Sequence, residues 1–177
     1  MQEAPLSRVM RVDSLPKEGQ IVTIEANAEE REALAAFLNL PSIEALGASL
    51  ALAPSGSRVR VTGAVHGELI QVCVVSLEPF PTTVDEEVDV LFARRAEGGA
   101  ARRAAAEPQT FSMTDKGEPD PIVDGKIDLG ALTAEFFALG LDPYPRKPGE
   151  SFESPEQPEA TVSPFWALAS RADKKPG

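Results

Sequence analysis

The residue types that most often perform chemistry in proteins are sparse in this chain. His66 is the only histidine and Cys73 the only cysteine among 177 residues. We expect His66 at a surface turn rather than acting as a general base. A cysteine nucleophile needs a basic neighbour that lowers its pKa, and no basic residue is predicted nearer to Cys73 on its face than Arg60. We therefore expect Cys73 on a strand as a small buried residue. A single cysteine also excludes an internal disulfide and a multi-cysteine metal cluster.

Carboxylates gather in one short stretch, at Asp85, Glu86, Glu87 and Asp89. Alternation along a strand sends Glu86 to the opposite face from the other three, so we expect a solvated acidic face and no metal site. The glycine pair 98–99 follows no strand-to-helix junction and does not indicate a phosphate-binding loop. The sequence therefore predicts a protein that is not an enzyme and has no cofactor, no metal and no small-molecule substrate.

Basic residues form local groups within a chain whose formal net charge is -11. That average repels phosphate, so RNA binding would need a basic patch. The candidate RNA-binding residues are Arg58, Arg60, Arg94, Arg95, Arg102, Arg103, Arg146 and Lys147. Two interpretations stay open: they form a basic surface if the segment after the sheet folds over Arg58 and Arg60, or they only solubilise loops.

The stretch 58–92 has the alternation of a β-meander. We expect a two-residue hairpin turn at Gly67 and Glu68, which pairs Val65 with Ile70 and makes one face almost wholly aliphatic. A turn at 55–56 adds a preceding strand, with Leu52 facing Val59 and Leu50 facing Val61. The last strand, 83–92, turns its acidic side to water and is predicted to be a charged edge strand.

Two helices are predicted to pack on this sheet, preceded by short strands at 6–12 and 20–26. The first, 28–39, starts with a capping box of Asn27 and Glu30 and presents Glu30, Leu34, Phe37 and Leu38 along one side. Residues 41–47 are expected to add a helical turn with Ile43 and Leu46 inward. The second helix starts at the N-cap Asp128, with Ile127 as a hydrophobic staple, and its predicted apolar stripe is Leu129, Leu132, Phe136 and Leu139.

These elements predict an α+β fold, in which a curved antiparallel sheet, a meander or partial barrel, packs with two main helices. We expect one domain at 1–145, with a flexible excursion at about 94–122. A flexible tail follows at 146–177, with a short helical motif at 163–171. No signal peptide and no membrane span is apparent in the sequence, which predicts a cytoplasmic protein. The oligomeric state does not follow from the sequence.

Three stretches in order resemble the YceD family, the large ribosomal RNA subunit accumulation proteins. They are VCVVSLEPF in the meander, IDLGALTAEFFALGLDPYPRKPG at the second helix and its exit, and SPFWALAS near the end. The positions that match the family pattern are Cys73, Leu77, Glu78, Pro79, Ile127, Asp128, Leu129, Glu135, Pro143, Pro145, Pro164, Phe165, Leu168 and Ala169. The lone cysteine and DPYPRKPG resemble members from alphaproteobacteria.

The resemblance implies a ribosome-biogenesis factor that supports 23S rRNA accumulation by binding rRNA or a protein of the pre-50S particle. Many members carry Cys-x-x-Cys where this chain has Cys73 and Ser76, so a zinc role suspected for them cannot operate here. An alternative stays open: a protein-protein adaptor without a ribosomal role, which uses the acidic face and the SPFWALAS motif. The candidate partner-binding residues are Pro164, Phe165, Trp166 and Leu168, because aromatic anchors concentrate binding energy.

Overall fold

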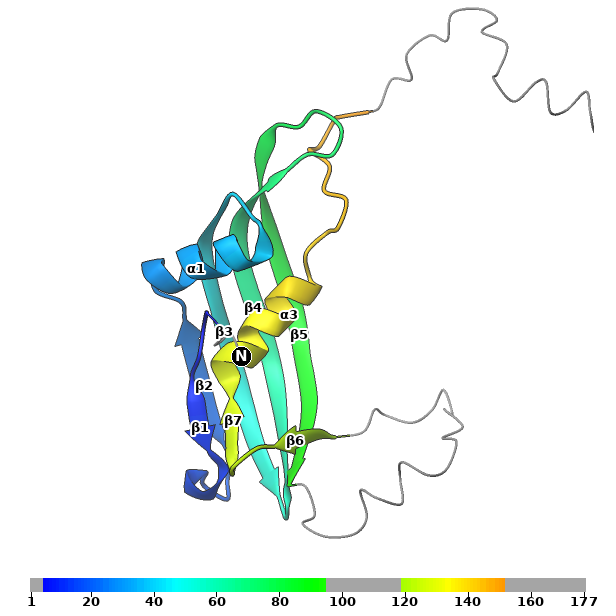
Figure 1. The fold of residues 1–177 in the computed structure, drawn as a ribbon. Helices are drawn as coiled ribbons and strands as arrows, with labels where there is room; N and C mark the ends of the chain where they lie inside the picture. The colour runs from blue at the N-terminus through cyan, green and yellow to red at the C-terminus, as the bar shows by residue number, and fades with distance from the viewer. Residues whose placement is uncertain (1–4, 95–118, 152–177) are drawn as a thin grey trace, which may run out of the picture.

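The computed structural model describes residues 5–94 and 119–151 of the chain. It contains seven strands, two α-helices and one short 3₁₀ helix, η1, in the described residues (Figure 1). In chain order they are β1 (Val9–Arg11), η1 (Val12–Ser14), β2 (Gln20–Glu25), α1 (Ala28–Leu38), β3 (Ser42–Ser55), β4 (Arg58–Val72), β5 (Pro79–Arg94), β6 (Asp120–Ile122), β7 (Lys126–Asp128) and α3 (Leu129–Leu139).

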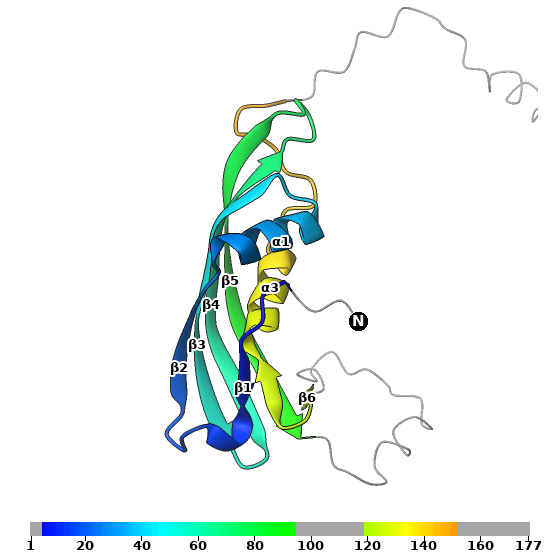
Figure 2. The same ribbon diagram turned by 60° about the vertical axis from the view of Figure 1, so that its left-hand side comes forward.

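The main layer is a five-stranded sheet in the order β2-β3-β4-β5-β6, and β1 and β7 form a separate two-stranded sheet. All pairs are antiparallel except the short β5–β6 pair. Both described helices lie on the same side of the curved main sheet (Figure 2). The predicted α+β fold with a curved sheet and two main helices is confirmed.

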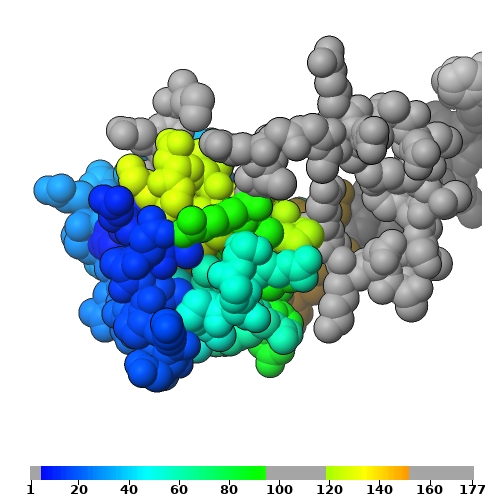
Figure 3. All heavy atoms as spheres, turned by 90° about the horizontal axis from the view of Figure 1, so that it is seen from below, coloured from blue at the N-terminus to red at the C-terminus, as the bar shows by residue number. Residues whose placement is uncertain are grey.

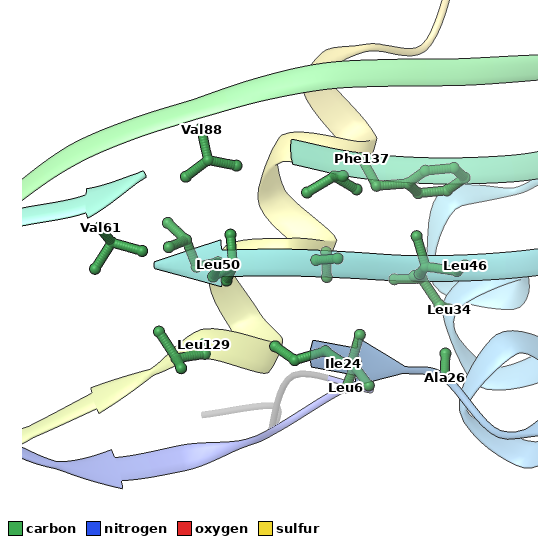
Figure 4. Packing of buried hydrophobic residues seen from close by; sticks show 14 of the residues in the cluster. Leu6, Ile24, Ala26, Leu34, Leu46, Leu50, Val61, Val88, Leu129 and Phe137 are labelled. Carbon is green, nitrogen blue, oxygen red and sulfur yellow. The ribbon is translucent and has the colours of Figure 1, made fainter. Parts of the chain in front are cut away.

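The hydrophobic core lies between the sheet and the helices (Figure 4). Alternate residues of the long strands supply one side of it, among them Leu50, Val61 and Val88. Leu129 and Phe137 of α3 supply part of the other side, and Phe137 has no exposed surface. Alternation leaves a mixed opposite face, with charged residues such as Asp85 and Glu87 and also exposed apolar residues such as Ile21 and Val72.

The predicted hairpin at Gly67 and Glu68 is wrong, because β4 runs straight through both residues. Gly67 pairs with Leu46 of β3 on one side and with Val84 of β5 on the other. A Cβ atom added at Gly67 would lie 2.4 Å from Cε2 of Phe137. The glycine therefore serves the close approach of an aromatic ring from α3, and not a turn. The connection between β4 and β5 lies further on, at 73–78.

The predicted helical turn at 41–47 is also wrong, since β3 begins at Ser42. Ile43 and Leu46 are nevertheless both buried, as expected. An irregularity between Ile43 and Ala45 shifts the register against β4, so an extra residue separates the two inward side chains. A β-bulge thus produces the three-residue spacing that, in sequence, indicates a helix.

The β3–β4 hairpin occurs where expected, but its register differs by two residues. Ser55 pairs with Arg58 and Leu52 pairs with Val61, so the turn residues are Gly56 and Ser57 rather than 55–56. Gly56 takes a positive φ of 61°, a conformation that suits glycine. A shift by two residues keeps each side chain on its face, so Leu52, Val59 and Val61 stay on the predicted aliphatic face. Ile70 and Val72, which the wrong hairpin had placed there, lie on the opposite face.

The helix starts are confirmed and the predicted apolar stripes are partly wrong. Asn27 and Glu30 form the capping box of α1, and Asp128 Oδ1 accepts hydrogen bonds from the N–H groups of Gly130 and Ala131. Phe37 and Leu139, however, are 59% and 70% exposed. On α3 the buried aromatic residue is Phe137, while Phe136 is half-buried, because the helix turns Phe137 toward Gly67.

The predicted excursion at about 94–122 is too long at both ends. Arg94 is the last residue of β5, and β6 pairs in parallel with the end of β5 from Asp120 onward. The remainder of the excursion and the motif at 163–171 lie outside the described residues. In the described part of the chain, neither helix is long and apolar enough to cross a membrane.

Replacing Phe137 by alanine should lower the free energy of unfolding by about 3 to 5 kcal/mol, because it leaves a cavity over Gly67. Phe136→Ala is the matched control and should cost clearly less, because its side chain is only half-buried. Urea unfolding of the two variants measures the difference. Equal losses would contradict the placement of α3 on the sheet.

Candidate functional site

Two of the stretches that resemble the YceD family meet at one end of the molecule, although about 70 residues separate them. The β4–β5 connection, 73–78, lies against the segment after α3, 141–151, which we call the strap. The N–H of Val74 donates to the carbonyl of Pro145 at 2.9 Å, and Gln71 Nε2 donates to the carbonyl of Asp142 at 3.2 Å. Lys147 Nζ and Glu78 Oε2 form an ion pair at 2.6 Å.

Cys73 is at the centre of this contact and has no exposed surface. Its Sγ accepts hydrogen bonds from three backbone N–H groups, those of Val75 and Lys147 at 3.4 Å and of Ser76 at 3.5 Å. The turn is closed by the N–H of Leu77, which donates to the carbonyl of Cys73. The sulfur therefore links the β4–β5 connection to the strap. The expectation of a buried cysteine is confirmed, but its expected place on a strand is wrong, because β4 ends at Val72.

The same donors change the acidity of the thiol. The N–H of Lys147 contributes most and Ser76 next, and together they lower the pKa of Cys73 from 9.0 to about 7 although burial opposes this. Donors that stabilise a thiolate do not make a nucleophile when reagents cannot reach the sulfur. Within the described residues, Cys73 has the geometry of a structural link.

Asp128, at the start of α3, has a structural role that its position in the sequence does not reveal. Besides capping α3 it accepts hydrogen bonds from Ser7 Oγ at 2.6 Å and from the N–H of Arg8 at 2.8 Å. Burial acts to raise the pKa of this carboxyl, but the four donors outweigh it and lower the pKa. Leu129 beside it is buried, whereas Glu135 is exposed on α3.

The candidate RNA-binding residues do not form one surface in the described part of the chain. Arg58, Arg60 and Arg94 lie at one end of the sheet, since Arg58 pairs with Ala93, Arg60 pairs with Leu91 and Arg94 contacts Asp13. Figure 3 shows this end of the molecule. Arg146 and Lys147 lie in the strap, at the opposite end (Figure 1). Arg95, Arg102 and Arg103 are outside the described residues, so the basic surface stays a prediction.

Carboxylates hold three of these cations. Arg60 forms a bidentate pair with Asp89, Arg94 pairs with Asp13, and Lys147 pairs with Glu78. For Arg58 and Arg146, no ion pair occurs between described residues. The carboxylates beside these cations lower the positive potential that a phosphate would meet, which weakens the case for this set as an RNA site.

His66 is a surface residue as expected, but in the middle of β4 rather than at a turn. Its Nδ1 lies 2.7 Å from Asp85 Oδ1, and this hydrogen bond raises the pKa of His66. Asp85, Glu87 and Asp89 face solvent and Glu86 lies half-buried on the other face, as alternation predicts. No three His, Cys, Asp or Glu side chains in residues 5–94 and 119–151 are grouped to hold a metal ion.

Two open grooves occur in the described structure. One of about 390 Å³ lies between α1 and the start of β3, and one of about 600 Å³ lies between β1, Val22 and Leu129. Neither is lined by His66 or Cys73.

Sequence reasoning missed Gln71 and Arg8. Gln71 is buried and donates to the strap, and Arg8 pairs with Glu30 through both guanidinium nitrogens, at 2.6 and 2.9 Å. A glutamine on an otherwise aliphatic strand was the available signal for the first. The second had no local signal, because its partner is 22 positions away.

The fold and these contacts define a small α+β protein whose family-motif residues, where described, mainly hold segments together. The sequence matches one family model, described as large ribosomal RNA subunit accumulation protein YceD, over residues 61–169. This match covers more than half of the chain, so the chain belongs to the YceD family, and the resemblance is confirmed. No curated protein and no solved structure matches the sequence.

The lowered pKa of Cys73 predicts a pH dependence of stability. The pKa of the thiol is about 7 in the folded state and 9.0 in the unfolded chain. Its contribution to the free energy of unfolding is therefore fully present above pH 9 and is lost as the pH falls through 7. The free energy of unfolding should therefore rise between these pH values more in the wild type than in Cys73→Ser. Urea unfolding across this range measures it, and parallel curves for the two proteins would show that the thiol does not ionise in the fold.

Proposed function

We propose that this protein supports the accumulation of 23S rRNA and the assembly of the large ribosomal subunit, and that it does so in the cytoplasm by binding. The carrying observation is the YceD family match, which extends from β4 through the Cys73 turn and α3 to residue 169. The order of the three motifs supports the same conclusion. We further propose that residues 1–145 form one domain and that the tail after it carries a binding motif at 163–171.

The chemistry of the described residues supports binding rather than catalysis. A general base and a nucleophile must lie within hydrogen-bond reach of one another and of a substrate. Cys73 is buried and held by backbone donors, whereas His66 is on the exposed side of the sheet with Asp85. One residue is buried and the other is exposed on the far side of the sheet, so they do not form a catalytic pair.

The charge of the described residues favours a protein partner over direct RNA contact. They include 10 lysines and arginines and 19 aspartates and glutamates, a net charge of -9. Such a surface repels phosphate and attracts positively charged proteins, which are available during assembly of a ribosomal subunit. Pro164, Phe165, Trp166 and Leu168 are proposed as further anchors for that partner.

Deletion of the gene tests the function directly. We expect 23S rRNA to fall relative to 16S rRNA and the 50S peak to shrink in a sucrose gradient, with both restored by the full-length protein. Unchanged 23S and 50S levels would count against a ribosomal role and favour the adaptor without one.

A further inference from the structure

The side of β2, β3, β4 and β5 that is turned away from α1 and α3 is not covered by any described element (Figure 2). We call this surface the outer face. Its middle is formed by small residues of β3 and β4: Ser49 pairs with Ala64, and Ala51 pairs with Thr62. Side chains of this size leave the sheet nearly flat, so the backbone of a partner can approach closely.

An acidic row borders this flat region along β5. The register places Glu87 beside Ala64 and Asp89 beside Thr62, with Asp85 next along the strand. Outward side chains on one strand repeat about every 7 Å, since each residue adds about 3.4 Å. The row thus carries a carboxylate at each repeat beside the small residues of β3 and β4. Two of the three are bound by β4 side chains, Asp85 by His66 and Asp89 by Arg60, and Glu87 between them forms no ion pair with a described residue.

The cations on the outer face do not cancel this charge. Five carboxylates point outward from β2, β4 and β5: Glu25, Glu68, Asp85, Glu87 and Asp89. Against them stand two arginines, Arg58 and Arg60, and His66, which is bound to Asp85. The Arg60–Asp89 pair is half exposed to solvent, with side chains 52% and 58% exposed, so a competing cation can replace it at small cost.

We propose that the outer face binds a lysine- and arginine-rich protein segment, whose backbone lies over the small residues and whose basic side chains reach the acidic row. This inference rests on the proposed function and specifies its partner. Long basic side chains fit the site because their aliphatic stems can lie on Ala51 and Ala64 while their charged ends meet Glu87 and its neighbours. An RNA strand does not fit, because its phosphates would face the same carboxylates.

Charge reversal at two locations tests the inference. Glu25→Lys with Glu87→Lys changes the outer face. Glu29→Lys with Glu32→Lys changes exposed residues of α1 by the same total charge and is called the helix variant. The probe is a short synthetic peptide in which lysine alternates with alanine, titrated calorimetrically at physiological salt. We expect about tenfold weaker binding for the outer-face variant and about twofold for the helix variant, because close charges dominate.

Equal weakening in both variants would overturn the inference, because attraction by net charge alone gives that result. A second result would also overturn it: the wild type binds no peptide but binds a single-stranded RNA oligonucleotide, and the outer-face variant still binds that RNA.

Complementation of a deletion strain is the second test. The inference is supported if the helix variant restores 23S rRNA and the outer-face variant does not. If both variants restore 23S rRNA, the inference fails while the proposed function stands. If deletion itself leaves 23S rRNA unchanged, the proposed function fails, and the peptide titration alone then decides the chemistry of the face.

Discussion

The contact between the Phe137 ring and the backbone of Gly67 determines how this molecule is arranged. Gly67 lies within β4 and lets the ring of Phe137 lie directly on the sheet, at a distance that any Cβ would prevent. This contact fixes α3 on one face of β4. It also fixes where the chain leaves α3, and therefore where the strap crosses the β4–β5 connection. One side of the sheet becomes core, and no element within residues 5–94 and 119–151 covers the other.

The strap depends on that placement. Gln71 and Val74 donate hydrogen bonds to the backbone of the strap, and Cys73 accepts one from it, so two stretches that resemble the family are held together at this end. Three backbone N–H groups surround the Cys73 sulfur, and these donors stabilise the turn. The described part of the motif thus marks a structural junction, although Leu77 and Tyr144 at this end are exposed.

Local signals in the sequence predicted the helix starts, the acidic side of β5 and the fold class. Asn27, Asp128 and the alternation around Val88 depend only on near neighbours, so they can be read without a structure. The failures came from contacts between distant residues. Gly67 looks like a turn residue until the ring above it is known, and the bulge at 43–45 imitates a helical spacing. Two adjacent phenylalanines at 136 and 137 cannot be ranked by periodicity alone. The junction at Cys73 had no sequence signal either, because its hydrogen bonds come from backbone groups.

Binding to a basic protein of the large subunit during its assembly is the central claim, and crosslinking in growing cells tests it most directly. A photoreactive residue in place of Thr62, on the outer face, would be activated by light, and the attached molecules identified by mass spectrometry and RNA sequencing. The account predicts lysine- and arginine-rich proteins of the large subunit or its precursors, joined through Thr62. Recovery of rRNA alone, or only of proteins unrelated to ribosomes, would contradict it.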